Sequence, residues 1–329
     1  MDILAGLESD GVRQQSLHAT AGALRDQVFG PRVFVRGVVE VSNYCRQNCH
    51  YCGMRRENRE LARYRLELDR LAELILEQRP AILTDIDLQA GEDPVAVRDI
   101  VIPLVKLIRQ HTNLGVTLCL GTLAPAEYDA LRESGAEYYV LKLETTDPAH
   151  YAALEAPGTL AGRLAAIRHL AATGWKVSSG IIAGLPGQTL AQLGAALALL
   201  HELPLAGSSV SPFIAGAQTP LAGQPTGGLE LTLNFLALLR HQNPHWIIPA
   251  VSALRSVGRD GYVRALQAGA NLATINLTPP AYRERYPIYK RDRNIMLEQG
   301  VREAIDQAGL QPSPVGVSEF LRTRAAAVA

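Results

Sequence analysis

From residue 33 onward, short apolar runs rich in Val, Ile and Leu alternate with longer segments in which apolar positions recur every three or four residues. The short runs predict β-strands, and the periodic segments predict amphipathic helices. The predicted strands cover residues 33–41, 85–89, 115–120, 138–144, 176–183, 208–214, 247–251 and 272–277. The predicted helices cover residues 68–78, 95–111, 125–134, 162–173, 190–200, 229–241, 259–268 and 296–308.

This alternation predicts the fold class. Strands separated by helices form a parallel sheet, and eight such units close into an α/β barrel of the TIM type. A doubly wound open sheet is the alternative, but no Gly-x-Gly-x-x-Gly follows a predicted strand. The 329 residues suit one barrel with additions, because the usual length is ~250 residues. We therefore expect a single (β/α)8 barrel over residues 33–311.

The two ends of the chain differ in pattern from the barrel. Residues 1–32 are predicted to be a helical N-terminal extension that covers the bottom or the side of the barrel. Residues 312–329 form a C-terminal tail without an informative pattern, and part of it is expected to be disordered. No linker rich in Pro, Gly or Ser divides the chain.

Charge and cysteine content narrow the class of protein. The 32 basic and 32 acidic residues balance, so neither nucleic acid nor a charged membrane surface is an expected partner. No apolar run is long enough to span a bilayer, and no signal peptide is evident. Three of the four cysteines are crowded into eight residues, which is a poor disulfide framework and indicates a reducing cytoplasm.

Polar side chains follow several of the predicted strands. In a barrel of this kind, the active site lies at the C-terminal ends of the strands. The sequence therefore predicts a site on one rim, with a substrate cavity lined by Gln89, Ser252, Asn276 and Thr278. The other polar residues after strands are Cys45, Cys49 and Cys52 after the first, Glu92 and Asp93 after the second, and Glu144 and Thr145 after the fourth.

The three cysteines Cys45, Cys49 and Cys52 have the spacing Cys-x3-Cys-x2-Cys, which indicates an iron–sulfur or a zinc site. Structural zinc usually takes four protein ligands, and the nearby His50 would close a tetrahedron under cramped geometry. A zinc-binding, non-catalytic barrel remains an alternative. Three thiolates on a four-iron cluster would leave one iron open to coordinate another molecule.

This spacing after the first strand of a β/α barrel resembles the radical S-adenosylmethionine (SAM) superfamily. The resemblance implies one 4Fe–4S cluster on Cys45, Cys49 and Cys52, with SAM bound to the open iron. Reduction would then cleave SAM to methionine and a 5′-deoxyadenosyl radical. Three further segments are similar to those of the superfamily: Tyr51 before the third cysteine, Ala90-Gly91-Glu92, and residues 180–184.

The same resemblance implies individual roles. Tyr51, Ile182 and Gly184 would lie beside the adenine, and Gly91 and Glu92 would meet the methionyl amino group. Glu144, counted with the cysteines as catalytic, would take the amino group or the ribose. Arg163 would form a forked pair with the methionyl carboxylate, or would be an ordinary solvated arginine. The implied partners are a small-molecule substrate and an electron donor such as flavodoxin or ferredoxin, and the protein would act as a monomer.

Longer segments resemble the HydE-like group, which contains the SAM maturases of FeFe hydrogenase. They are residues 33–45, 51–58, 89–94, 143–145, 184–189, 212–214, 219–221, 269–271, 276–279 and 282–286. A methylornithine-synthase-like amino-acid mutase, or another diverged reaction of the wider group with biotin synthase, is the alternative function. Sulfur insertion is disfavoured, because only Cys119 is left for a second cluster. We expect Cys119 to be a small buried residue of the third strand.

The sequence differs from the HydE-like group mainly at positions that the resemblance assigns to the substrate cavity. Lys142 stands where an arginine is common, and Val251-Ser252 keeps only one of two usual hydroxyls. Thr274-Ile275-Asn276 replaces Met-Pro-Asn. The resemblance therefore leaves the identity of the substrate open. The basic run over residues 55–65 is interpreted as a solvated face, of which a few arginines support the cluster.

Overall fold

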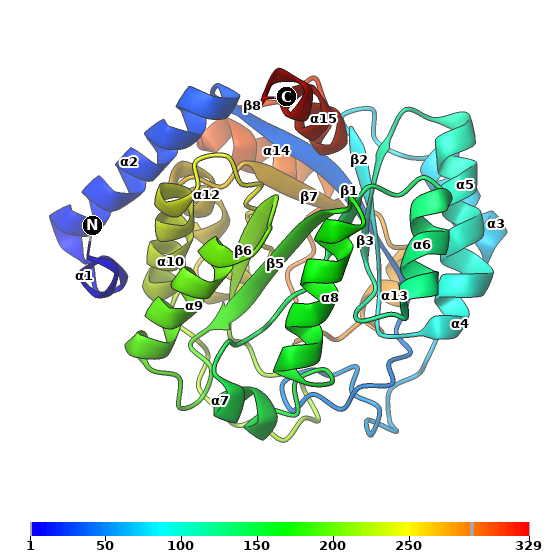
Figure 1. Ribbon diagram of the computed structural model, residues 1–329, viewed down its shortest axis with the longest axis horizontal. Helices are drawn as coiled ribbons and strands as arrows, with labels where there is room; N and C mark the ends of the chain where they lie inside the picture. Colours follow the sequence, from blue (N-terminus) through cyan, green and yellow to red (C-terminus); the bar gives the residue numbers. More distant parts are fainter. Residues whose placement is uncertain (1, 290–292, 329) are drawn as a thin grey trace.

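The computed structural model describes residues 2–289 and 293–328, which form a parallel β-barrel wrapped by helices (Figure 1). The strands are β1 (Arg32–Ser42), β2 (Asp85–Ala90), β3 (Gly115–Cys119), β4 (Tyr138–Val140), β5 (Lys176–Ala183), β6 (Gly207–Pro212), β7 (Leu272–Asn276) and the two-residue β8 (Gln311–Pro312). Their order is β6-β5-β4-β3-β2-β1-β7, all pairs are parallel, and β8 pairs with the start of β1. The predicted α/β barrel is confirmed.

The predicted strand over residues 247–251 is wrong as a regular strand, although the segment closes the barrel. It contributes two isolated parallel bridges, Gly207 with Ile247 and Pro249 with Leu272, which join β6 to β7. The Ser208 amide donates to the Ile247 carbonyl at 3.1 Å, and the Ala250 amide donates to the Leu272 carbonyl at 2.9 Å. Pro249 has no N–H to donate, which limits the ladder to these few bonds.

Helices are present at every position where the sequence predicts one. They are α3 (Leu68–Leu76), α5 (Ile102–His111), α6 (Pro125–Glu133), α8 (Leu160–Ala172), α9 (Leu190–Glu202), α10 (Leu229–Gln242), α12 (Gly261–Gln267) and α14 (Glu298–Gln307). The predicted helix over 95–111 begins as α4 (Pro94–Ala96) and passes through a π-helical turn, Val97–Val101, before α5. Pro103 cannot donate to the carbonyl four residues earlier, which favours such a turn. The remaining short helices are α7 (Pro148–Ala153), α11 (Ala253–Val257) and α13 (Pro280–Arg283).

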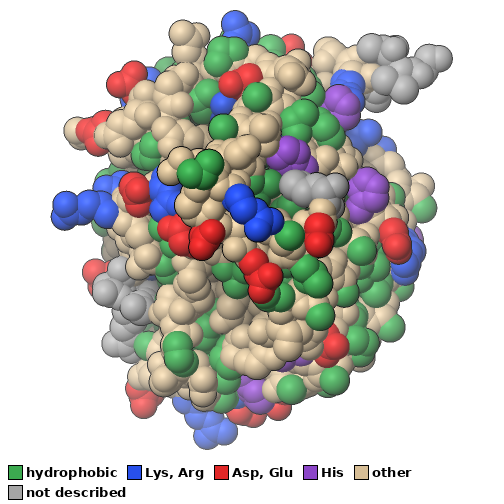
Figure 2. All heavy atoms as spheres, turned by 90° about the vertical axis from the view of Figure 1, so that its left-hand side faces the viewer, with side chains coloured by type: hydrophobic (Ala, Val, Ile, Leu, Met, Phe, Trp, Pro, Cys, Tyr) green, Lys and Arg blue, Asp and Glu red, His purple; other side chains and the backbone are tan. Residues whose placement is uncertain are grey.

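The N-terminal extension covers the side of the barrel. Helices α1 (Ile3–Leu7) and α2 (Gly11–Phe29) pack against α10, and α1 also packs against α9. The buried Asn234 of α10 donates to the carbonyls of Leu7 and Ser9 at 3.0 and 2.8 Å, which fixes the connection between the two helices. On this face of the molecule, acidic, basic and histidine side chains are interspersed with apolar ones, without a large patch of one sign (Figure 2).

The C-terminal tail, expected to be partly disordered, instead forms helix α15 (Val317–Val328). Its first turn is held by Asp85 of β2, whose carboxylate accepts the amides of Val317 at 2.9 Å and Ser318 at 3.3 Å. Val317 is buried with Phe34, Tyr138 and Leu272 at the N-terminal ends of the strands. The helix therefore closes the bottom of the barrel, opposite the rim that carries the cysteines. Over the described ranges, no helix is both long and apolar enough to cross a membrane.

Candidate active site

The cysteine loop leaves β1 at Ser42 and borders a pocket at the C-terminal ends of the strands. Cys45, Cys49 and Cys52 all line this pocket, which encloses about 1100 Å³, partly open to solvent. All three thiols are free, and Cys49 is buried. Gly91, at the end of β2, faces the loop so closely that a Cβ there would lie 2.2 Å from the Tyr44 carbonyl oxygen. The loop can take this path only because residue 91 is glycine.

The electrostatics of the three thiols fit a cationic cluster. Burial raises the pKa of each, that of Cys49 to about 12, and the neighbouring thiolates add to the rise at Cys49 and Cys52. Three thiolates this close therefore need a positive charge to be stable, and iron supplies it.

Zinc would need all its ligands to converge on one ion, with a fourth protein ligand beside the three thiols. The Nε2 atom of His50, the fourth ligand considered for zinc, lies 3.4 Å from the Glu155 carboxylate. A four-iron cluster does not require convergence on one point, because each thiolate binds a different iron.

Two arginines of the basic run hold the loop in place. Arg63 donates to the carbonyls of Asn43, Met54 and Arg55 at 2.6–2.8 Å, and thereby joins both ends of the loop. Arg65 pairs with both oxygens of the buried Asp93 at 2.7 and 2.9 Å. These two arginines are therefore not part of a solvated face. The interpretation from the sequence allowed for a few such arginines, although it gave them an electrostatic role towards the cluster. In the sequence, only the basic character of these residues suggested a role, and it does not indicate which groups they hydrogen-bond.

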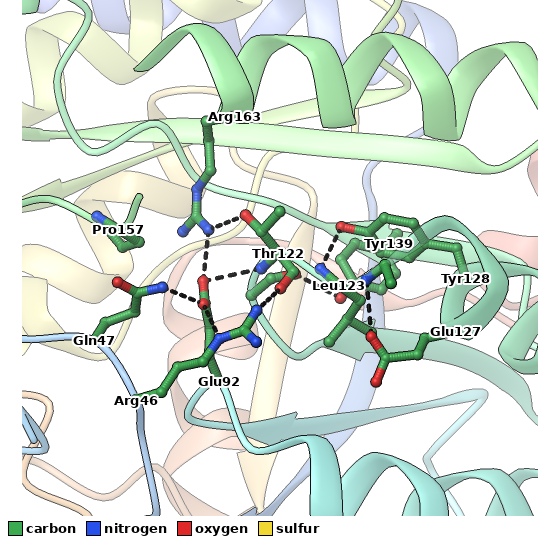
Figure 3. A network of polar contacts seen from close by, with 12 residues as sticks. Arg46, Gln47, Glu92, Thr122, Leu123, Glu127, Tyr128, Tyr139, Pro157 and Arg163 are labelled. Atoms are coloured by element: carbon green, nitrogen blue, oxygen red, sulfur yellow. Dashed lines mark hydrogen bonds and ion pairs between the residues drawn. The ribbon is translucent and has the colours of Figure 1, made fainter. Parts of the chain in front are cut away.

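Arg163 lies in the first turn of α8 and is buried rather than solvated. The Thr159 hydroxyl caps this helix by accepting the Gly162 amide at 3.1 Å, which sets the start of α8 beside β4. The NH1 group of Arg163 donates to Glu92 at 2.9 Å and to the Thr122 hydroxyl at 2.7 Å (Figure 3). Its Nε donates to the Lys142 carbonyl at 2.9 Å. Only NH2 is left without an acceptor among the described residues, so a full forked pair with another carboxylate is not available.

Glu144 follows β4 in a left-handed conformation with φ 65°. The predicted strand over 138–144 therefore ends early, at Val140, although a bridge still joins Glu144 to Ile181 of β5. The Glu144 side chain lines the pocket. Burial raises the pKa of its carboxyl group, and the charges of Lys142 and Arg163 oppose this rise. A strained backbone with a buried acid is typical of a functional site.

The remaining residues predicted to bind SAM occupy different positions. Tyr51 and Ile182 line the pocket with Gly91, and Tyr51 packs in an apolar group with Tyr151, Leu154 and Phe213. Gly184 does not line it. With φ 81° it makes the turn after β5, where a Cβ would lie 2.6 Å from the Gly227 Cα.

A second cavity lies inside the barrel and adjoins the first. It encloses about 1090 Å³, partly open to solvent. The two cavities share part of their lining, including Gln89, Cys119, Lys142 and Tyr289. Cys119 is therefore not simply a buried residue of β3: it borders both spaces. The position of Cys119 at the end of a predicted strand is the one feature of the sequence that suggests this placement.

Of the predicted cavity residues, Gln89, Ser252 and Asn276 line this interior space. Thr278 does not, and its prediction is corrected: it is buried, and its hydroxyl accepts the Glu40 amide at 3.0 Å. The Asn276 amide is used within the protein, since Nδ2 donates to Glu40 at 3.1 Å and Oδ1 accepts the Thr278 amide at 2.9 Å. The Ser252 hydroxyl lies 3.0 Å from the Tyr289 hydroxyl.

Among the described residues, five charged side chains line the interior cavity. Arg36 lies 3.4 Å from Asp87, and Arg293 pairs with Glu40 at 2.5 Å. These ion pairs leave Lys142 as the charged group of the cavity without an ion-pair partner in the described residues. Lys142 stands where the two cavities meet.

Comparison with known proteins places this geometry in a family. The model of the radical SAM superfamily matches residues 39–200. The [FeFe] hydrogenase maturase subunit HydE of Thermotoga maritima is 35% identical over 278 residues, which are 84% of this chain and 79% of that protein. This chain belongs to the radical SAM superfamily. It is a radical SAM enzyme of HydE-like type, and its family uses a 4Fe–4S cluster and SAM.

Other relatives of this radical SAM enzyme cover nearly the same range. A 3-methylornithine synthase of Methanosarcina barkeri is 31% identical over 88% of this chain and 82% of that protein. The crystal structure of methylornithine synthase (PylB) is similar with a TM-score of 0.85 and 27% identity, covering 98% of this chain and 95% of that one. The chain is thus similar over most of its length both to a hydrogenase maturase and to methylornithine synthases.

Proposed function

We propose that Cys45, Cys49 and Cys52 hold the 4Fe–4S cluster of this radical SAM enzyme, and that a small polar substrate reacts inside the barrel. The observation that carries the proposal is the adjacency of the two cavities. One contains the three thiols, the other is lined by polar residues within the barrel, and they meet at Gln89, Cys119 and Lys142. A group bound in the cysteine pocket can therefore reach a substrate bound in the interior cavity.

When bound, the cluster and SAM supply an electron and a carbon-centred radical. The enzyme's own residues hold SAM and keep water away. Tyr51 and Ile182 offer apolar surface to the adenine, Glu144 offers an acceptor to the ribose or the amino group, and Arg163 offers its free NH2 to the carboxylate. The enclosing barrel limits side reactions of a reactive intermediate.

The reaction that we favour is HydE-like, in the maturation of FeFe hydrogenase. The identity to HydE over most of the chain supports it. An amino-acid mutase reaction on a compact zwitterion is the second candidate, and the similarity to methylornithine synthase over 98% of this chain favours it. In either case we expect flavodoxin or ferredoxin as electron donor, a monomer, and a reducing compartment such as the cytoplasm, to which the four free thiols are suited.

Anaerobic reconstitution tests the proposal. Protein loaded with iron and sulfide, then given dithionite and SAM, should form 5′-deoxyadenosine, and its absence would overturn SAM cleavage. Cys49→Ala should abolish the absorbance of the cluster, whereas Cys119→Ser, the matched control, should keep it. Retained brown colour in Cys49→Ala, or equal loss in both variants, would contradict the ligand assignment. A zinc titration of the wild type that blocks iron loading at one equivalent would favour the zinc alternative.

A further inference from the structure

Glu92 has no acceptor position to spare. Its Oε1 accepts the Thr122 amide and Arg163 NH1, both at 2.9 Å, and its Oε2 accepts Arg46 Nε at 3.3 Å and Gln47 Nε2 (Figure 3). An ionised carboxylate offers about four acceptor positions. Four donors from the protein therefore saturate it, and an ammonium group could bind only by displacing one of them.

The four donors come from three separate segments. Arg46 and Gln47 belong to the cysteine loop, Thr122 follows β3, and Arg163 begins α8. The backbone adds to these ties, since the Arg46 amide donates to the Glu92 carbonyl at 3.1 Å and Arg46 NH2 donates to the Thr122 carbonyl at 2.8 Å. The loop after β3 folds directly over the Glu92 side chain. A Cβ at Gly121 would lie 2.0 Å from Glu92 Cγ, and Gly121 has φ 76°.

We propose that Glu92 is a positioning residue, which fixes the Cys45–Cys49 segment relative to Arg163, and that it does not bind the amino group of SAM directly. Residues 46 and 47 lie between the first two cysteines, so holding them fixes both thiols. The same carboxylate holds NH1 of Arg163 and thereby turns NH2 towards SAM. Hydrogen bonds to a buried carboxylate are strong, and this suits the role. The inference rests on the proposed function, because it assumes that the pocket binds SAM.

Two ligands separate positioning from direct contact. The reconstituted wild type and Glu92→Gln would be titrated with SAM and with the SAM analogue that lacks the amino group. A positioning role predicts that Glu92→Gln weakens both ligands by the same factor, about tenfold or more, because the shared geometry is disturbed. If Glu92 binds the amino group, SAM is weakened and the analogue is not. That result would overturn the inference.

Gln47→Leu provides the matched variant from the loop side. It removes one donor to Glu92 and leaves the carboxylate in place. Glu92→Gln and Gln47→Leu should both raise amide hydrogen exchange of residues 43–53 in the apoprotein. They should also shift the electron paramagnetic resonance spectrum of the reduced cluster in the same direction, with effects that are less than additive in the double variant. Unchanged amide hydrogen exchange of residues 43–53 in Gln47→Leu would overturn the inference. This test can be made even if Glu92→Gln fails to fold. Failure of the wild type to bind a cluster or SAM would instead overturn the proposed function.

Discussion

Glu144 combines two unfavourable features in one residue. Its backbone lies in the left-handed region, which costs a non-glycine residue roughly 1–3 kcal/mol when imposed by the fold. Its carboxyl group is enclosed by protein, and burial raises its pKa. Both features lower the stability of the apoprotein. Together they are typical of a functional position, and they support the proposed contact of Glu144 with SAM.

Glu144→Gln should therefore stabilise the apoprotein at high pH. A raised pKa means that the folded state binds the proton more tightly than the unfolded chain. Stability is then highest below the ordinary carboxyl pKa of 4.5 and falls as pH rises through the raised value. Glutamine does not titrate. The gain in free energy of unfolding should thus grow from pH 5 to pH 8 in urea denaturation. An equal difference between variant and wild type at both values would contradict this account.

The predictability of the site differs from residue to residue. Cys45 and Arg163 lie beside strand and helix ends, so the motif and the element pattern together place them in the pocket. The prediction for Thr278 is wrong because the chain has turned two residues past β7. Its hydroxyl accepts the Glu40 amide instead of lining the cavity. The contacts of Arg63 with three carbonyls depend on the path of the cysteine loop, which has no periodic pattern.

At the scale of elements, two segments departed from prediction for different physical reasons. Residues 247–251 look like a strand because they are apolar, but Pro249 restricts them to isolated bridges. Helix α15 is amphipathic through Val317, Phe320 and Leu321, a short stripe in a polar tail. What makes it stable is Asp85, a residue more than two hundred positions earlier that caps its first turn. The pattern of apolar and polar residues within the tail cannot indicate a partner so distant in the sequence.

Asp85→Ala should consequently release α15. Loss of the capping carboxylate should lower the free energy of unfolding by about 1 kcal/mol, the usual effect of removing an N-cap. Amide exchange should rise most in residues 317–324. Ser318→Ala is the control in the same turn, because the Ser318 hydroxyl is buried without a hydrogen-bond partner in the described structure and its removal should cost little. Equal loss of protection in both variants would show that helix packing, not the cap, holds α15.

At the scale of the whole molecule, the barrel is closed at one end and carries the cysteine pocket at the other. Tyr138, Ile247 and Leu272 line the interior cavity and also pack with Val317 of α15 in the same apolar cluster. The bottom of the cavity is therefore sealed by side chains that depend on the C-terminal helix. The cysteine pocket borders the cavity at its other end. This arrangement suits a reaction in which bulk water must be kept from a radical.

Lys142 predicts the charge of the ligand that the cavity holds. Within residues 2–289 and 293–328, Lys142 has no ion-pair partner, and the other charged side chains that line the cavity form two ion pairs. A ligand that supplies an anionic group next to Lys142 should therefore gain affinity. Propionate, compared with chloride at equal ionic strength, should stabilise the wild type by about 1.4 kcal/mol at ~tenfold excess over its dissociation constant.

Lys142→Met should abolish this stabilisation, since the other positive charges that line the cavity in the described structure are already paired with carboxylates. Lys106→Met provides the matched control, because it removes the same charge from an exposed position on α5. Thermal unfolding of the three proteins with each salt measures the difference. Equal stabilisation of all three by propionate would mean that the anion binds elsewhere. Loss of SAM affinity in Lys142→Met, without loss of the propionate effect, would assign Lys142 to the cofactor instead of the substrate.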